Sequence, residues 1–287
     1  MEIMFLGTRA ADYWPGCFVG MENRFDKDNR RTTSTLIDRH ILLDAGAHVL
    51  DELRIADIEY LQITDIIITH FHNDHFNAKN IAAIAAGREA PLRLWVTAKA
   101  VAEAVALAEA KAEDDVRAKI RAALSQIPGT EIHPMKPGET YELSEDFRVT
   151  GLPANHDPRY FPQHLLIEAG FRKEKQKIFY GMDGGWLLFD TYQRLKKQKL
   201  DLMILDCTVG DYVGDQRLAE HNSLPMIRLM LPSLKTVGAI DDHTVIYIDH
   251  LAFTLHKSHE ETVEICRKDG IHVAYDGLVI HSPEWLE

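Results

Sequence analysis

The sequence predicts an α/β protein in which two mixed β-sheets pack against each other, with helices on the outside. A strand-rich first section that contains hairpins is followed by helices, and a similar mixture then recurs along the 287 residues. This order differs from the regular strand–helix alternation of a doubly wound sheet. No low-complexity linker and no tandem repeat of fixed period divides the sequence. We therefore expect a single domain over residues 1–287.

Short apolar runs rich in β-branched residues predict the strands, and turn residues separate them. Residues 33–37 and 41–43, for example, form a hairpin pattern around Asp38-Arg39-His40. The predicted strands span residues 3–6, 33–37, 41–43, 65–68, 92–96, 130–135, 140–143, 147–152, 163–168, 177–180, 202–205 and 245–248, and two short strands finish the chain.

Helical periodicity occupies segments between these strands. The predicted helices span residues 47–55, 76–86, 98–124, 187–197, 224–231 and 258–268. The Ala-rich segment 98–124 is either one long helix or a bent pair. Ser258 and Glu261 have the spacing of a capping box at the start of the last helix.

Two irregular segments are expected outside these elements. Residues 9–31 are polar and aromatic and form a long connection, which indicates either a functional loop or a partly mobile one. Residues 171–177 are expected to form a charged, solvated hairpin tip.

Composition and charge restrict the classes of function. The apolar content of 46% suffices for a sizeable core, and the net charge is −12 with histidine neutral. This charge disfavours nucleic-acid or membrane binding by long-range attraction, although a local basic patch or a bound metal would override it. The three cysteines are far apart and in no C-x-x-C, which is typical of reduced thiols in the cytoplasm. The sequence shows neither a basic leader with a long apolar core nor an apolar run of ~20 residues, so we expect a cytoplasmic protein without a membrane span.

One turn carries most of the ligand-type side chains. It reads Thr69-His70-Phe71-His72-Asn73-Asp74-His75 and lies between a predicted buried strand and a predicted helix. Imidazole and carboxylate are good ligands for zinc, manganese or iron. His70 and His72 can point the same way from extended backbone, and Asp74 and His75 can serve a second ion. A loop of unrelated surface residues is the alternative, but four such side chains in six positions argue against it.

Further ligand-type residues directly follow later predicted strands, as His70 does. They are His156, Asp183 and His250. Taken alone, each could be a hydrogen-bonded histidine or a turn aspartate. Together they indicate that strand ends from distant parts of the chain supply one site.

The motif H-x-H-x-D-H after a strand, followed by His, Asp and His, resembles the signature of the metallo-β-lactamase superfamily. The resemblance implies a four-layer αββα sandwich with its site at one edge between the sheets. It also implies two divalent metal ions per chain, for which zinc suits the His-rich set best and manganese is the alternative. One ion would be held by His70, His72 and His156, the other by Asp74, His75 and His250, and Asp183 would bridge both.

Two more residues match motifs of the superfamily. Asp44 would fix the metal turn through hydrogen bonds without being a ligand, and a plain turn aspartate before Gly46 is the competing interpretation. His221 would assist at the phosphate, as in the phosphodiesterase branch, and a histidine at a helix start is the competing interpretation. Asp74 and His221 form the predicted catalytic set.

Other motifs resemble the branch that contains cyclic-phosphate phosphodiesterases and tRNA 3′-processing enzymes. They are Leu6-Gly7-Thr8, residues 32–37 and residues 41–46. The first motif usually has a second glycine where this chain has Arg9. This resemblance implies a binuclear metal-dependent hydrolase, in the first place a phosphodiesterase. Its substrate would be a small phosphodiester or cyclic phosphate, attacked by a hydroxide that bridges the metals.

Alternatives stay open at this point: a tRNA 3′ endonuclease, a lactone or thioester hydrolase, and a non-catalytic metal-binding module. The acidic balance and the lack of an obvious basic, glycine-rich arm disfavour the endonuclease. The missing leader disfavours a secreted β-lactamase, and His72 stands where a diiron redox enzyme would have a carboxylate. The expected partner is therefore a small-molecule ester or phosphodiester. Nucleic acid is disfavoured, a membrane is not expected, and a homodimer is left open.

Overall fold

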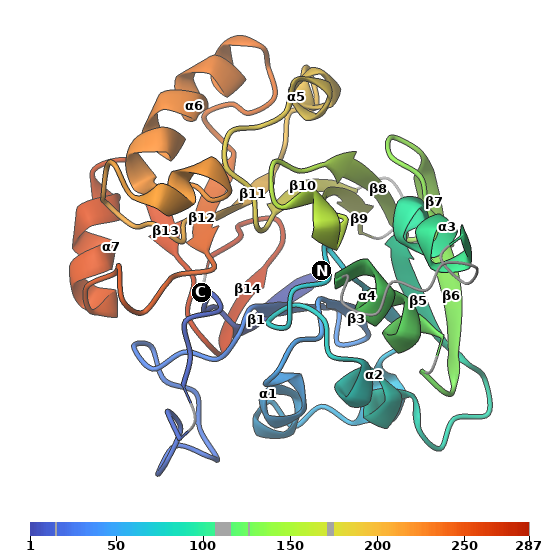
Figure 1. Ribbon diagram of the computed structural model, residues 1–287. Coiled ribbons are helices and arrows are strands. Elements are labelled where there is room, and N and C mark those ends of the chain that lie inside the picture. The colour runs from blue at the N-terminus through green and yellow to red at the C-terminus, as the bar shows by residue number, and fades with distance from the viewer. Residues whose placement is uncertain (15, 107–115, 126, 171–174, 287) are drawn as a thin grey trace.

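The computed structural model describes residues 1–14, 16–106, 116–125, 127–170 and 175–286. Two mixed β-sheets of seven strands each pack together, and helices cover their outer faces (Figure 1). The predicted α/β sandwich is therefore confirmed. No helix in these ranges is long and apolar enough to cross a membrane.

The first sheet has the spatial order β14-β1-β2-β3-β4-β5-β6. Neighbouring strands are antiparallel from β14 to β3 and parallel from β3 to β6. The bounds are β1 Glu2–Gly7, β2 Ser34–Ile37, β3 Ile41–Leu43, β4 Asp65–Ile67, β5 Leu92–Thr97, β6 Thr130–Met135 and β14 Leu278–His281.

The second sheet has the order β13-β12-β11-β10-β9-β8-β7. It repeats the same pattern, since neighbours are antiparallel from β7 to β10 and parallel from β10 to β13. The bounds are β7 Thr140–Ser144, β8 Phe147–Pro153, β9 Gln163–Ala169, β10 Gln176–Gly181, β11 Leu202–Asp206, β12 Val245–Asp249 and β13 Ile271–Val273.

The helices divide between the two outer faces. The first sheet is covered by α1 (Val49–Ile55), α2 (Ala78–Ala85), α3 (Ala98–Ala106) and α4 (Val116–Leu124). The second sheet is covered by α5 (Phe189–Leu195), α6 (Leu224–Thr236) and α7 (His259–Arg267). Short 3₁₀ helices lie at Tyr60–Gln62, Pro158–Tyr160 and Gln216–Ala219.

A continuous apolar core fills the space between the sheets. Phe5 of the first sheet packs on Tyr247 of the second, with ring centroids 5.5 Å apart. Ile167 and Tyr180 are fully buried in the same core. Burial of each such side chain stabilises the fold by roughly 1.5–3 kcal/mol, which makes the sandwich a rigid support for the loops at its edges.

The observed ends of some helices differ from the sequence-based predictions because a local interaction fixes where the helix begins or ends. Helix α2 begins at Ala78 because the Asn77 side chain accepts hydrogen bonds from the backbone N–H groups of Lys79 and Asn80. Helix α6 continues through Pro232 to Thr236, because Leu234 packs in the core beyond the proline. The capping box of Ser258 and Glu261 is confirmed.

Three sequence predictions involve residues outside the described ranges. In the segment 98–124 the described parts are α3 and α4, which pack against each other as the bent pair predicts, while residues 107–115 lie outside the description. Residues 171–174 of the predicted hairpin tip also lie outside it. The described part of the loop 9–31, which excludes residue 15, contains turns and no helix or named strand.

Gly46 brings the turn after β3 against the backbone of the 69–75 turn. A Cβ atom at Gly46 would overlap the carbonyl group of Asp74. We expect Gly46→Ala to lower the free energy of unfolding by about 1–3 kcal/mol or more, because backbone must shift to relieve the overlap. Urea unfolding measures the change.

Gly185→Ala is the matched control. A Cβ there would meet its nearest neighbour, Asn155 Nδ2, at 3.4 Å, which is ordinary contact. This variant should unfold at nearly the wild-type urea concentration. Equal stability of the two variants would show that the close approach of the turns does not constrain the fold.

Candidate metal centre

The turn after β4 and the loop after β8 bring three imidazoles together. Nδ1 of His72 lies 2.9 Å from Nε2 of His70 and 2.9 Å from Nε2 of His156. One oxygen of Asp183, Oδ2, lies 3.4 Å from the His70 nitrogen and 3.6 Å from the His156 nitrogen. These four atoms form one group that could hold a metal ion.

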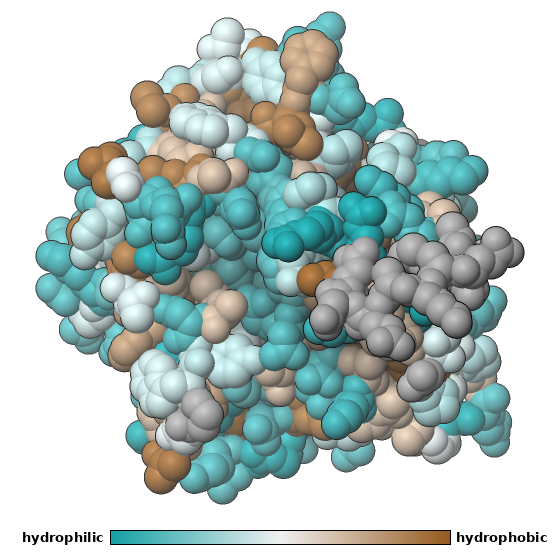
Figure 2. Space-filling model, viewed as in Figure 1, coloured by the Kyte–Doolittle hydropathy of each residue, from teal (hydrophilic) through white to brown (hydrophobic). Residues whose placement is uncertain are grey.

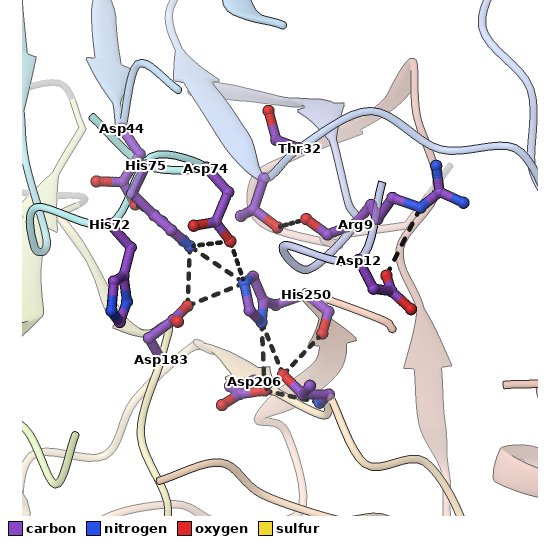
Figure 3. A network of polar contacts seen from close by, with 12 residues as sticks. Arg9, Asp12, Thr32, Asp44, His72, Asp74, His75, Asp183, Asp206 and His250 are labelled. Atoms are coloured by element: carbon purple, nitrogen blue, oxygen red, sulfur yellow. Dashed lines mark hydrogen bonds and ion pairs between the residues drawn. The ribbon is translucent and has the colours of Figure 1, made fainter. Parts of the chain in front are cut away.

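A second group forms beside the first. Nε2 of His75 lies 3.1 Å from Nε2 of His250, and Oδ2 of Asp74 lies 3.5 Å from the former and 3.3 Å from the latter. The other oxygen of Asp183, Oδ1, lies 2.9 Å from His75 Nε2 and 3.1 Å from His250 Nε2. Asp183 thus offers one oxygen to each group, and Figure 3 shows its side chain facing His75 and His250.

The structure therefore brings together every residue that the sequence predicts as a ligand. They come from the loops after β4, β8, β10 and β12, so both sheets contribute. Asp44, Asp183 and His250 have positive φ angles of 62°, 45° and 57°. Left-handed backbone is unfavourable for these residues, and such strain is typical of functional sites.

Outer contacts determine which nitrogen of four histidines faces the centre. Nδ1 of His75 lies 2.8 Å from Asp44 Oδ2, and Nδ1 of His250 lies 2.7 Å from the Thr208 hydroxyl. Nδ1 of His70 and His156 likewise face the Thr69 hydroxyl at 3.1 Å and the Glu220 carbonyl at 3.2 Å. Because Nδ1 is engaged outward in each case, Nε2 is the nitrogen left to face a cation.

Asp44 lies where the sequence places it, behind the metal turn. Its carboxylate accepts hydrogen bonds from the backbone N–H of Thr69 at 2.7 Å and from the Thr69 hydroxyl at 2.8 Å. It is fully buried, and it contacts His75 from the side away from Asp183. Asp44 therefore orients the turn without belonging to either ligand group.

Asp206 and Thr208 are site residues that the sequence analysis missed. Thr208 Oγ1 donates to Asp206 Oδ1 at 2.6 Å and faces His250, while Asp206 Oδ2 lies 2.8 Å from Nδ1 of His221. The signal was available, since Asp206 directly follows the predicted strand 202–205. Through these contacts β11 supports both His250 and His221.

His221 stands beside both groups. Its ring centroid lies 4.9 Å from that of His156 and 5.5 Å from that of His250. Burial alone would lower the pKa of His221, but the neighbouring Asp206 carboxylate outweighs burial and raises the pKa. His221 is therefore more readily protonated than an ordinary histidine.

The two ligand groups differ in charge balance. Burial lowers the pKa of His72 to about 4 and holds that of His70 well below its usual value. Burial acts the same way on His75 and His250, but the nearby carboxylates, Asp183 foremost, outweigh it. They raise the pKa of His250 to about 10 and that of His75 well above its usual value. The second group therefore attracts positive charge strongly.

The donor set fits a pair of divalent cations. Asp183 Oδ1 is buried and accepts no hydrogen bond of good geometry from any described residue, although two imidazole nitrogens lie within 3.1 Å of it. Nitrogen and oxygen atoms that converge at such distances in a buried place are suited to share a cation. Nitrogen and carboxylate ligands without sulfur suit zinc or manganese.

A cavity of about 1050 Å³ opens over these groups. His72, Asp74, Asp183, His221 and His250 are in its wall, and Figure 2 shows hydrophilic residues around a hollow on this face. Other parts of the wall come from α4 and from the loop 9–31. The volume suffices for a small molecule next to both ligand groups.

Comparison with known proteins agrees with this geometry. A family model described as a beta-lactamase superfamily domain matches residues 39–268. No curated protein matches the chain.

Solved structures share the fold at low sequence identity. Human tRNase Z, short form, is 18% identical with a TM-score of 0.63, and the match covers 99% of this chain and 100% of that chain. Zn²⁺-bound PqqB from Methylobacterium extorquens is 15% identical with a TM-score of 0.66, covering 98% and 100%. A diphosphatase from the PhnP family is 18% identical with a TM-score of 0.66, covering 100% and 99%.

Metal binding at neutral pH should release protons. Since the pKa values of His75 and His250 are raised, both hold a proton at pH 7 in metal-free protein and must lose it to bind a cation. We expect about two protons released per chain on zinc loading at pH 7, and less release as the pH rises toward about 10. Calorimetric titration in buffers of different ionisation enthalpy counts the protons.

His250→Gln should release fewer protons, whereas the exposed control His243→Gln should match the wild type. Zinc binding without proton release at pH 7 would contradict the charge balance described for the second group.

Proposed function

The chain belongs to the metallo-β-lactamase superfamily, and on this premise we propose that it is a binuclear metal-dependent hydrolase acting on a small phosphodiester or cyclic phosphate. The observation that carries the proposal is Asp183, which offers one oxygen to each of two histidine groups in the wall of a cavity. A site for a single structural metal would not need a carboxylate in this position.

In this proposal one ion is held by His70, His72 and His156 and the other by Asp74, His75 and His250, with Asp183 between them. We propose zinc for this His-rich set, with manganese as the alternative. When bound, two such cations supply a water nucleophile at neutral pH and neutralise negative charge on the substrate.

The protein's own residues would orient the substrate and move protons. Asp206 holds Nδ1 of His221 at 2.8 Å, and the opposite ring nitrogen has no hydrogen-bond partner among the described residues. Since His221 is in the cavity wall and its pKa is raised, it is suited to donate a proton to a leaving oxygen or a hydrogen bond to a phosphoryl oxygen.

With two divalent cations bound, the cavity wall would carry a net positive charge and favour an anionic substrate. Lys79, Lys119 and Arg217 contribute to the wall together with the carboxylates of Asp12, Asp74, Asp183 and Glu220, and neither lysine forms an ion pair with a described residue. The names tRNase and diphosphatase belong to two of the similar structures and agree with a phosphorus-centred substrate. Because the whole chain has a charge of −12, the attraction is local to the cavity.

The tRNA 3′ endonuclease is the second candidate, because human tRNase Z matches over almost the whole chain. The acidic balance argues against it, since RNA binding depends on many basic contacts to phosphates. Lactone or thioester hydrolysis and a non-catalytic metal module are kept as outcomes of the experiment below. We also propose a cytoplasmic location, with which the free cysteines Cys17, Cys207 and Cys266 agree.

Hydrolysis of bis-p-nitrophenyl phosphate by zinc- or manganese-loaded protein tests the proposal. We expect steady-state turnover by the wild type and a loss of roughly a thousandfold or more in Asp74→Ala, because the second ion loses a ligand. Asp146→Ala, an exposed position in the turn between β7 and β8, is the matched control and should keep full activity.

The pattern of failure separates the alternatives. If the protein hydrolyses lactones or thioesters but no phosphodiester, its substrate is a lactone or thioester and not a phosphodiester. Cleavage of precursor tRNA that strongly exceeds cleavage of small phosphodiesters would favour the endonuclease. If protein that holds two metal ions per chain hydrolyses no ester, the non-catalytic metal-binding module is favoured.

His221→Ala should lower kcat by roughly a hundredfold while metal content stays at the wild-type value, since a general acid contributes about that much or more. In the wild type, activity should fall as the pH rises through the raised pKa of His221, and the variant should lack this decline.

Metal analysis distinguishes this role from coordination, because His221 also lies within reach of Asp183 and His250. Loss of one ion in His221→Ala would make His221 a ligand instead. His243→Ala serves as the exposed control.

A further inference from the structure

We propose that Tyr13, in the loop 9–31, contacts the substrate and donates a hydrogen bond from its hydroxyl to an oxygen of the phosphodiester. This inference rests on the proposed function, because it assigns a substrate contact in the same cavity. It also gives a specific role to a loop that the sequence predicts to be either functional or partly mobile.

Tyr13 is part of the cavity wall that also contains His72, Asp74 and His250. Its hydroxyl lies 2.6 Å from Nδ2 of Asn73. Asn73 stands between His72 and Asp74 in the metal turn, so the hydroxyl is tied directly to the segment that supplies both ligand groups. A substrate bound at the two groups would therefore lie within reach of this side chain.

The hydrogen bond from Asn73 leaves the phenolic hydrogen unused. The amide donates, so the Tyr13 oxygen accepts, and no described residue accepts a hydrogen bond from this hydroxyl. A phenol can donate one hydrogen bond while it accepts another. The cavity that Tyr13 lines provides space for such an acceptor.

The ring of Tyr13 is held in place by its neighbours. The Tyr13 and His48 rings pack edge to face at a centroid distance of 4.7 Å, and Phe18 and His48 pack in the same way at 4.8 Å. His48 Nδ1 in turn lies 3.2 Å from the Thr32 hydroxyl. Such packing orients a side chain before the substrate arrives, which reduces the entropy lost on binding.

The chain directly before Tyr13 is anchored to the loop that follows His250. Asp12 accepts hydrogen bonds from the backbone N–H groups of Phe253 at 3.0 Å and Thr254 at 2.9 Å, and from the Thr254 hydroxyl at 2.9 Å. Backbone hydrogen bonds continue this contact: the Leu251 N–H donates to the Thr8 carbonyl at 2.8 Å, and the Ala10 N–H donates to the Leu251 carbonyl at 3.4 Å. Tyr13 is thus fixed relative to ligands of the second group as well as to the metal turn.

Arg9 explains how the loop keeps this position. Its guanidinium is buried and lies 5.1 Å from the ring centroid of Trp14 and 4.7 Å from that of Phe253, so it joins the two loops through cation–π contacts. Figure 3 shows Arg9 directed away from His75 and Asp183, toward Asp12. The arginine that replaces an expected glycine therefore supports the loop rather than the ions.

The test compares Tyr13→Phe with the wild type and with Tyr212→Phe, an exposed tyrosine outside the cavity wall. The phenylalanine keeps the packing on His48 and removes only the hydroxyl. Removal of a hydrogen bond to a charged oxygen should lower kcat/KM for bis-p-nitrophenyl phosphate roughly ten- to a hundredfold. The affinity of metal-loaded protein for inorganic phosphate, measured by calorimetry, should fall in parallel.

Metal content and the midpoint of thermal unfolding should equal the wild-type values in both variants, which a purely structural role of Tyr13 would not produce. If the wild type hydrolyses phosphodiesters and Tyr13→Phe does so equally well, the inference is wrong and the proposed function stands. If the loaded wild type hydrolyses no ester, the proposed function fails, and equal phosphate affinity of Tyr13→Phe and wild type would then overturn the inference separately.

Discussion

Asp183 imposes the constraint on which the rest of the site depends. Five imidazoles and two carboxylates converge within a few ångströms of one another in a buried place. One oxygen of Asp183 faces the group of His70 and the other faces the group of His75. A carboxylate shared in this way is suited to hold two cations close together, because it offsets their mutual repulsion.

The packed sandwich stabilises this arrangement against its backbone strain and its loss of conformational entropy. The ligands stand on loops directly after buried strands of both sheets, and the packed core fixes those strand ends. Outer contacts then fix each side chain: Asp44 orients His75, and Thr208 with Asp206 orients His250. The left-handed backbone at Asp183 and His250 is tolerated because the surroundings determine it on every side.

Much of this could be predicted from the sequence, because a buried strand leaves a clear apolar run and the residue after it can be identified. That reasoning located His70, His156, Asp183 and His250, which the structure brings together. Asp206 offered the same signal, because it directly follows the predicted strand 202–205. Tyr13 gave none, and Arg9 stood out only as a departure from a glycine. Their partners, Asn73 and Phe253, are distant in sequence, and only the fold brings them near. The start of α2 depended on the side chain of Asn77, a contact that apolar periodicity does not encode.

The central claim is that Asp183 stands between two cations. Anomalous diffraction at the zinc edge, from crystals grown with zinc chloride, tests this most directly. The account predicts two zinc peaks, one among His70, His72 and His156 and one among Asp74, His75 and His250, each in contact with a different oxygen of Asp183. A single peak, or two peaks of which neither contacts Asp183, would contradict it.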